Sequence, residues 1–461
     1  MSKSLFRDPV FQNFVTQRPI ATAAQMVLRR ILDPEAIDQL FHDNAQLQYE
    51  QTLLFSTLTR MMTSVALGVR TSVNAAYKKM DQQLAVSVNA VYNKLQRIEP
   101  QTSNALVRHS YNQTVEINKR IGGVRKNDLP GYQTNILDGN HLAKTQHRIK
   151  QTRNLVAGPL PGKSLVVFDP RHDAILDFFA IEDGHAQELS ALDQVIETLR
   201  SKQLWIADRN FCTLKFLYSI AAKSGCFVIR QHGKLHGEIW GKEKRIGKTE
   251  TGVVYENKLL LPSYEGKSMV VRRVVAKLFS PTRDGDEQIV ILTNLPSDEA
   301  DATKVSELYR GRWKIETAFM HMTVSLNCEV ETLCYPPAAL FCFATALLGY
   351  NAISVIKTMI GREHGRRESE MLSHFYVASE LVETTDGLLI AFDANRWNEV
   401  AAMSVDEFVP ELLDVAKQID MKTYRKSVRG PKKPPPKKKG NKRTVHVSTK
   451  RLLEKSKVKR C

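Results

Sequence analysis

Short apolar segments that alternate with helical patterns from about residue 130 constrain this fold more than any other feature of the sequence. The candidate strands in the first part of this region are Gln133–Asp138, Leu165–Asp169, Ala174–Ile181, Leu204–Asp208 and Cys226–Arg230. Helices are predicted near 186–200 and 213–224, from apolar residues at helical spacing. Three early strands followed by alternating helices and strands indicate an α/β fold, with a mixed sheet covered by helices.

The sequence on either side of this region divides the chain into further segments. Residues 1–125 have helical patterns, and 232–295 turn β-rich between Gly, Pro and charged turns. We therefore predict a helical N-terminal domain over 1–125, the first part of an α/β core over 126–231, a β-rich insertion over 232–295, the second part of the core over 296–382, a mixed segment over 383–421 and a disordered basic tail over 422–461.

The positive charge of the chain is concentrated at its C-terminal end. The 461 residues carry a net charge of +17, and residues 422–461 contribute +16 of it, from 17 Lys and Arg against the single acidic residue Glu454. We expect the tail to have nonspecific affinity for DNA, although a charge run also suits a solvated linker. Any function of the body must be argued from its motifs.

Cysteine usage and hydropathy predict a protein of the reducing cytosol. The six cysteines form no C-x-x-C pair and no Cys/His array, and Met1–Ile20 lacks the continuous apolar core of a secretory signal. Ala338–Ile356 is uncharged and close to the length that spans a bilayer. Because it contains Thr345, Asn351 and Ser354 and follows two prolines, we predict a buried helix and no membrane partner.

One N-terminal helix is a candidate for reading DNA. The helical pattern that begins after Ser87 leaves Asn89, Asn93, Lys94 and Arg97 on a polar face, away from an apolar stripe. Such a face could enter a major groove as the second helix of a helix-turn-helix. An ordinary amphipathic helix with a solvated face fits the pattern about as well.

Two aspartates follow predicted strands at positions where distant residues meet. Asp138 stands just before Gly-Asn, and Asp208 just before Arg-Asn-Phe. Neighbouring strands lie about 4.8 Å apart, so two such carboxylates could share divalent ions. An Asp at a strand end is more often a turn former or a helix cap, and this applies equally to Asp169 and Asp173. Position alone does not select among the four.

The segment from Tyr309 to Glu316 carries the more specific pattern. At 100° per residue, Tyr309, Arg312, Trp313 and Glu316 fall on one face of a helix. Its aromatic, guanidinium and carboxylate groups could stack on a base, grip a phosphate and complete a metal site. The simpler interpretation is a surface helix with an Arg312–Glu316 ion pair worth a few tenths of a kcal/mol.

Four motifs in order resemble those of the DDE transposases of the insertion-sequence-four family, named for their Tyr-Arg-Glu-Lys signature. The motifs are Asp138-Gly-Asn, Ala207-Asp208-Arg-Asn-Phe, Leu292-Thr-Asn-Leu-Pro and Tyr309-x-x-Arg312-x-x-x-Glu316. The resemblance covers about residues 130–330. It implies a ribonuclease-H-like core with a β-rich insertion between the second Asp and the Glu.

The resemblance also implies the chemistry of the site. It assigns Asp138, Asp208 and Glu316 as a catalytic, metal-binding triad that takes Mg²⁺, with Mn²⁺ as a substitute. It assigns Tyr309 and Arg312 to contacts with DNA, to which the helical face adds Trp313. Asp169 and Asp173 become structural candidates.

The implied function is cut-and-paste transposition of an insertion sequence. The partners would be double-stranded DNA, as terminal inverted repeats and as target, and a second copy in a DNA-assembled homodimer. The N-terminal helical domain would bind DNA, and the protein would work in the cytoplasm on the nucleoid.

One departure from the family pattern keeps two alternatives open. The family places Lys seven residues after the Glu, and this chain has Thr323 there. Met320 is nearest to it in angle, while Lys314 and His321 point away, so no cation on that face replaces the Lys. The alternatives are a decayed or domesticated transposase that only binds DNA, and a ribonuclease-H-like DNA nuclease.

Overall fold

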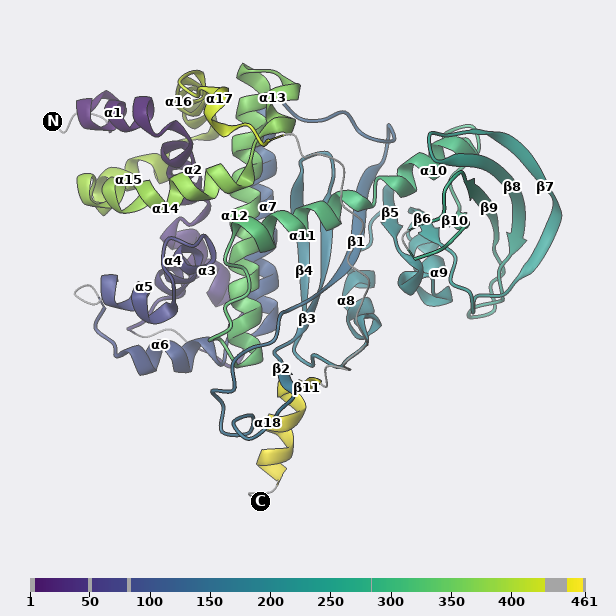
Figure 1. The fold of residues 1–461 in the computed structure, drawn as a ribbon, viewed down its shortest axis with the longest axis horizontal. Helices are drawn as coiled ribbons and strands as arrows, with labels where there is room; N and C mark the ends of the chain where they lie inside the picture. Colours follow the sequence, from purple (N-terminus) through teal and green to yellow (C-terminus); the bar gives the residue numbers. More distant parts are fainter. Residues whose placement is uncertain (1–4, 49–51, 81–83, 283, 428–445, 459–461) are drawn as a thin grey trace.

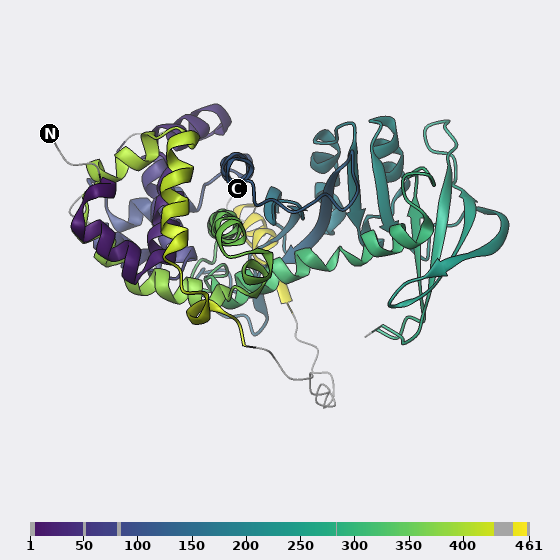
Figure 2. The same ribbon diagram turned by 90° about the horizontal axis from the view of Figure 1, so that it is seen from above.

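The computed structural model describes residues 5–48, 52–80, 84–282, 284–427 and 446–458 (Figure 1). Figures 1 and 2 show a body of helices at one end, a sheet in the middle, and curled strands at the other end. Helix α2 (Pro19–Ile31) contacts α14 (His374–Ala391) and α15 (Ala394–Ala402), so helices from before and after the sheet meet in the helical body. The site described below lies where the sheet meets two later helices.

A nine-stranded mixed sheet forms the centre of the fold, as predicted. Its order is β4-β3-β1-β5-β6-β10-β9-β8-β7. Strands β1, β5 and β6 are parallel, and every other neighbouring pair is antiparallel. The strands are β1 (Gln133–His141), β3 (Lys163–Asp169), β4 (Ala174–Ile181), β5 (Gln203–Ala207), β6 (Cys226–Arg230), β7 (Glu238–Lys248), β8 (Gly252–Leu260), β9 (Val270–Leu278) and β10 (Gln288–Thr293).

The strands of the β-rich region 232–295 continue this same sheet. Strand β10 pairs with β6, and β9, β8 and β7 follow outward. The sequence patterns located β8, β9 and β10 but missed β7. Ten of its eleven residues are exposed, so it lacks the apolar alternation that marks a half-buried strand.

Alternation along the strands divides the core into two layers. Ile136 and Ile206 belong to the cluster that includes helices α7 (Pro100–Ile121) and α12 (Pro336–Glu363). Leu137 and Ala207 belong to the cluster that includes α8 (Leu192–Glu197) and α9 (Leu214–Ala222). Because successive side chains point to opposite faces, even-numbered residues of β1 and β5 face the α7 and α12 side.

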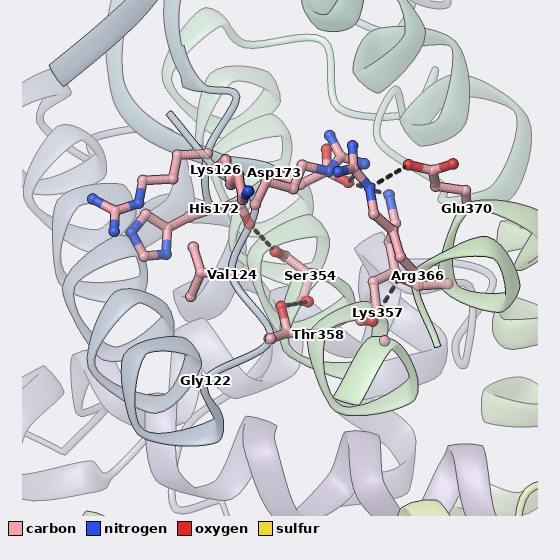
Figure 3. A pocket seen from close by; sticks show the side chains of 15 residues that line it. Gly122, Val124, Lys126, His172, Asp173, Ser354, Lys357, Thr358, Arg366 and Glu370 are labelled. Carbon is pink, nitrogen blue, oxygen red and sulfur yellow. Dashed lines mark hydrogen bonds and ion pairs between the residues drawn. The ribbon is translucent and has the colours of Figure 1, made fainter. Parts of the chain in front are cut away.

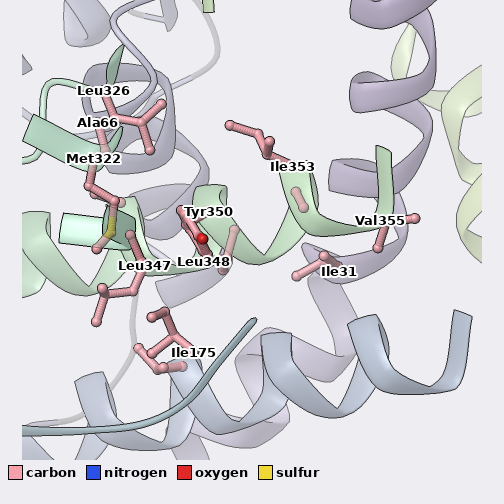
Figure 4. Close-up of a cluster of buried hydrophobic side chains, with 14 of the residues drawn as sticks. Ile31, Ala66, Ile175, Met322, Leu326, Leu347, Leu348, Tyr350, Ile353 and Val355 are labelled. Carbon is pink, nitrogen blue, oxygen red and sulfur yellow. The ribbon is translucent and has the colours of Figure 1, made fainter. Parts of the chain in front are cut away.

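Helix α12 is the buried helix that the sequence predicted over 338–356. It is the helix within the described residues that is long and apolar enough to cross a membrane, and it is buried inside the fold (Figure 4). Its polar groups are bonded internally. Asn351 accepts from Ile175 N (2.7 Å) and donates to Ser110 Oγ (2.9 Å), and Ser354 donates to the His172 carbonyl (2.5 Å).

The remaining helices build the helical body. Before the sheet come α1 (Pro9–Gln17), α2 (Pro19–Ile31), α3 (Pro34–Asn44), α4 (Phe55–Ala66), α5 (Val73–Met80) and α6 (Val88–Leu95); after it come α13 (Arg366–Met371), α14 (His374–Ala391), α15 (Ala394–Ala402), α16 (Val405–Lys417) and α17 (Met421–Tyr424). The prediction of mixed structure over 383–421 is therefore wrong. The side chains of Asp393 and Ser404 cap α15 and α16, and these short helices broke the apolar pattern into pieces too brief to recognise.

The prediction of disorder over the whole tail is wrong for its last part. Residues 428–445 lie outside the described residues, but His446–Ser448 form β11, which pairs with β2 (Gly158–Leu160). Helix α18 (Thr449–Val458) follows. Lys450 and Arg451 bind Glu182 and Asp183 at 2.9 and 2.6 Å, so acidic partners on the body anchor a segment that the sequence showed only as charge.

Helix α6 starts after Ser87 as predicted but ends at Leu95, before Ile98, which the prediction included, and its polar face has one change. Asn89, Asn93 and Arg97 are exposed, as a groove-reading face requires. Lys94 is half-buried and donates to the Leu53 carbonyl (2.7 Å), over the ring of Phe41. Three of the four predicted polar residues therefore remain available on the surface.

Candidate active site

The two aspartates lie side by side, but the prediction that Asp138 ends a strand is wrong, because pairing with β3 continues β1 to His141. Strands β1 and β5 are parallel neighbours with Leu137 paired to Ala207, so Asp138 and Asp208 are the next residues along the chain after this pair. Both are even-numbered and project to the sheet face that α7 and α12 cover. Asp208 also caps a short 3-10 helix, where it accepts from Asn210 N (2.8 Å). Asp208 is therefore a helix cap, as the simpler interpretation of a strand-end Asp expected. It also lies beside Asp138, which that interpretation did not require.

The segment Tyr309–Glu316 is two helices, and the prediction of one shared helical face is wrong. Helix α10 (Ala302–Arg310) ends before Gly311, and α11 (Trp313–Ser325) starts after Arg312. The backbone turns here through bonds of the i to i+3 type, from Arg312 N to the Tyr309 carbonyl and from Lys314 N to Gly311. Glycine at a helix junction is a common cause of such a break.

This break places Arg312 between the sheet and α11. Its Nη1 donates to Asp138 Oδ2 at 2.8 Å, and its Nη2 donates to Glu316 Oε1 at 2.6 Å. The ion pair expected for a surface helix does occur. The bond to Asp138, 174 residues earlier in the chain, shows that this helix end is part of a site instead.

The carboxyl group of Asp138 lies in an environment that disfavours its charged form. Burial raises the pKa of its carboxyl group to about 7; Arg312 lowers that pKa, while the charges of Asp208 and Glu316 raise it. All three acidic groups are therefore close enough to repel one another, and one guanidinium serves two of them. Perturbed carboxylates of this kind are concentrated at functional sites.

The three carboxylates do not converge on one point. Among the described residues, no group of three His, Cys, Asp or Glu side chains has the arrangement of a metal site. Arg312 occupies the space between Asp138 and Glu316 and links them through its two nitrogens. The structure brings the predicted residues into one neighbourhood, and the prediction that they share metal ions stays a prediction.

Comparison with known families identifies the region that contains this site. Residues 130–339 match the model of the family described as the transposase DDE domain. This part of the chain is similar to the transposase DDE domain, and residues 130–339 are called the DDE domain below after that similarity. It includes Asp138, Asp208, Arg312 and Glu316.

Relatives of the DDE domain are found in insertion sequences of Escherichia coli. The transposase of insertion sequence element IS421 and InsL, the protein assigned as transposase to IS186A in strain K12, are each 24% identical over 196 residues, which covers 35% of this chain. The match spans about half of each relative, 52%. Among solved structures, the piggyBac transposase synaptic complex with hairpin DNA aligns with 84% of both chains at 8% identity and a TM-score of 0.42, too distant to transfer residue roles.

Tyr309 and Trp313, the two predicted aromatic DNA contacts of the DDE domain, differ in their exposure to solvent. Tyr309 is 7% exposed, and burial raises the pKa of its hydroxyl, so its ring is not free to stack on a base. Trp313 is 60% exposed, with the Arg312 guanidinium 5.5 Å from its ring centre. Both line a cavity of about 400 Å³ with Phe279. Of the predicted DNA contacts, Trp313 is the accessible aromatic one.

Thr323 of the DDE domain lies two turns beyond Glu316 on an exposed face. Its hydroxyl donates to the Phe319 carbonyl of its own helix (2.9 Å). Lys314 and His321, which the helical angles predicted to point away from this position, are engaged elsewhere. Lys314 binds Asp128 at 2.8 Å, and the His321 ring stacks on His374 with centroids 3.9 Å apart.

Two residues beside the site were missed at the sequence level. Arg230 ends β6, the third parallel strand, and its charge lowers the pKa of Tyr309 against the effect of burial. The strand-end argument that made Asp138 a candidate could have found it. Glu188 packs its carboxyl against Gly139, where a Cβ would lie 2.4 Å from it. No sequence pattern indicated this contact.

The other candidate residues of the DDE domain have structural roles. Asn294 accepts from Phe227 N (2.9 Å) and donates to the Gly225 carbonyl (3.0 Å), which fixes the start of β6. Asp169 accepts from the Tyr111 hydroxyl (2.7 Å). Asp173 binds Lys357 and accepts from the Tyr350 hydroxyl (3.0 Å), beside a cavity of about 300 Å³ (Figure 3).

Proposed function

We propose that this protein is a DNA transposase that cuts and joins strands at the ends of an insertion sequence. The observation that carries the proposal is the junction of Asp138, Asp208, Arg312 and Glu316 inside a segment that matches the transposase DDE domain. Asp138 and Asp208 come from two neighbouring strands, and Glu316 comes from a helix more than 100 positions later. Folding alone gives no reason to bring these three acids into one neighbourhood, because their repulsion destabilises the fold.

The catalytic core is of the ribonuclease-H type in this proposal. Five strands in the order β4-β3-β1-β5-β6, with β3 antiparallel to its neighbours and β5 and β6 parallel to β1, support it. Strands β7 to β10 then form the insertion between Asp208 and Glu316. The insertion extends the sheet and contributes Phe279 to the cavity beside Trp313.

The donor set fits divalent metal ions. Asp138, Asp208 and Glu316 are oxygen ligands of the kind that Mg²⁺ and Mn²⁺ prefer, and their mutual repulsion would be relieved by added positive charge. When bound, such ions supply an activated hydroxyl and stabilise charge on the leaving oxygen of a phosphodiester. The raised pKa of Asp138 means that its proton must leave before the carboxylate can act as a ligand.

Arg312 has two roles in this proposal. It holds Asp138 and Glu316 in position through its two nitrogens before metal arrives. Its guanidinium could also grip a phosphate of the end DNA. Trp313, exposed next to it, offers a stacking surface to an unpaired base. Two copies would assemble on paired ends, in the cytoplasm on the nucleoid.

The sharpest test replaces Asp208 by Asn. Asparagine is as good an N-cap as aspartate, so the short helix that follows is retained while one metal ligand loses its charge. We expect Asp208→Asn to bind end DNA and to lose Mg²⁺-dependent strand cleavage. Asp301→Asn, which alters another N-cap that accepts from Lys304 N (2.7 Å), is the matched control and should keep full cleavage. Cleavage by the Asp208 variant would refute the assignment.

Thr323 favours a second candidate, a protein that binds ends without cutting them. Its hydroxyl is satisfied within its own helix, so the structure gives it no catalytic contact. A cleavage assay with Mg²⁺ or Mn²⁺ separates the candidates, and Thr323→Lys should raise cleavage if only phosphate grip has been lost. A strand-transfer assay distinguishes a transposase from a nuclease of the same fold, since only the transposase joins ends to target DNA.

A further inference from the structure

A second site candidate lies in the helical body, outside the DDE domain. A cavity of about 300 Å³ opens between α2, α4, α14 and α15. Arg29 of α2 and Arg60 of α4 line it, and no Asp or Glu is found among its lining residues in the described part of the chain. The other walls include leucines and hydroxyl side chains: Leu28, Leu32, Leu54, Leu67, Ser56 and Thr63.

Neither guanidinium has an anionic partner. Within the described ranges, Arg29 and Arg60 make no hydrogen bond and no ion pair, and Arg29 lies over the ring of Trp397 at 5.6 Å. Trp397, also in the wall, is 1% exposed, and its Nε1 is buried without a hydrogen-bond partner. Elsewhere in the same body Arg70 is bound to Asp386, so the fold does supply acids to arginines.

The electrostatics of the cavity call for an anion. Burial, and then the charge of Arg60, lower the pKa of Arg29 to about 10, and burial lowers the pKa of Arg60. Two like charges in a partly desolvated space repel each other, and this weakens the fold. A terminal phosphate carries close to two negative charges at neutral pH and three acceptor oxygens, which match two guanidinium forks.

We propose that Arg29 and Arg60 form a binding site for a terminal phosphate group, with the leucine wall of the cavity beside it. The phosphate is either the free inorganic ion or the 5′-phosphate of a DNA strand, since both present the same dianion. A backbone phosphodiester, with one charge, would leave one guanidinium uncompensated. The site is independent of the cleavage chemistry proposed above.

The test uses the full-length protein and inorganic phosphate. Calorimetric titration at constant ionic strength should show binding to the wild type, at least tenfold weaker in Arg29→Gln and in Arg60→Gln. Arg153→Gln removes an exposed arginine outside the cavity and should bind like the wild type. Thermal unfolding without phosphate should show each cavity variant as stable as the wild type or more so, because a buried unpaired charge is gone. Arg29→Lys, which keeps the charge but loses the fork, should bind with intermediate affinity.

Two results would overturn the proposal: a wild type that responds to phosphate no more than to chloride, or cavity variants that bind phosphate as the wild type does. Anisotropy with one duplex, with and without a 5′-phosphate, identifies the source. Tighter binding of the phosphorylated duplex that depends on Arg29 and Arg60 supports the DNA end. Equal binding of both duplexes, with phosphate binding intact, supports the free ion. Neither readout depends on cleavage.

Discussion

Asp138, on the interior strand β1, and Asp173, in the turn between β3 and β4, have opposite electrostatic properties. Asp138 shares Arg312 with Glu316 and faces Asp208, and its pKa is raised to about 7. Asp173 has Lys357 and Arg125 to itself, the latter at 3.5 Å, and these cations lower its pKa despite burial. Carboxylates outnumber cationic side chains around Asp138, and cationic side chains outnumber carboxylates around Asp173.

The difference shows how neighbours turn the same residue into a functional or a structural group. A carboxylate whose cations outnumber it is satisfied by the protein, so removing it exposes buried positive charge. A carboxylate that competes with other acids for one cation keeps negative charge that the protein does not compensate. Only the second kind is suited to binding a further cation.

Removing each carboxylate in turn and measuring cleavage is the strongest test of the functional difference between Asp138 and Asp173. Asp138→Asn should lower Mg²⁺-dependent cleavage of end DNA by about 10³-fold or more, because a ligand of the reacting centre is lost. Asp173→Asn should keep cleavage per folded molecule within about tenfold. Quantified by single-turnover cleavage on a labelled duplex, equal losses in both variants would show that the distinction is wrong.

Stability should respond in the reverse order. Asp173→Asn strands the buried Lys357 and should cost about 3–5 kcal/mol of unfolding free energy. Asp173 has φ 52, a conformation that asparagine tolerates, so the loss is not one of backbone strain. Asp138→Asn should change stability by no more than about 1 kcal/mol. Urea denaturation measures both, and Asp173→Asn with Lys357→Met should recover part of the loss if the stranded charge is its cause.

The sequence could predict most strands of the sheet because these depend on local patterns. Strand β4 and strand β6 have the predicted bounds, and Asp138 and Asp208 lie beside each other as predicted, although β1 continues past Asp138 to His141. It could not predict β7, whose side chains are exposed, or the anchored α18, whose partners Glu182 and Asp183 are distant in sequence.

The site shows the same limit more sharply. Periodicity placed Tyr309, Arg312 and Glu316 on one face because it assumed an unbroken helix, and the break at Gly311 buried Tyr309 and turned Arg312 toward Asp138. The motif identified the participants. Their contacts depend on tertiary packing, which spacing alone does not contain.

Removing Arg312 tests whether its guanidinium competes with metal ions at the Asp138 site. Arg312→Gln takes one positive charge from between two carboxylates, so Mn²⁺ should bind about tenfold tighter or more in the absence of DNA. The same variant should lose affinity for end DNA and cleave poorly, because the phosphate grip is gone. Calorimetric titration and anisotropy give the two readouts. Weaker Mn²⁺ binding would mean that Arg312 positions the ligands more than it competes with the metal.

The smallest expected effect is the pH dependence of that binding. The folded pKa of Asp138 lies near 7, above its ordinary value of 3.8, so the folded protein holds this proton between those values and metal must displace it. Affinity for Mn²⁺ should therefore rise about tenfold per pH unit below 7 and level off above it. The stability that the retained proton contributes is present at low pH and is lost as pH rises through 7. Titrations in buffers of different ionisation enthalpy should count about one proton released at pH 6 and almost none at pH 8.5. Asp138→Asn should abolish this release, whereas release that persists in the variant would assign the proton to another group and leave Asp138 without its distinguishing property.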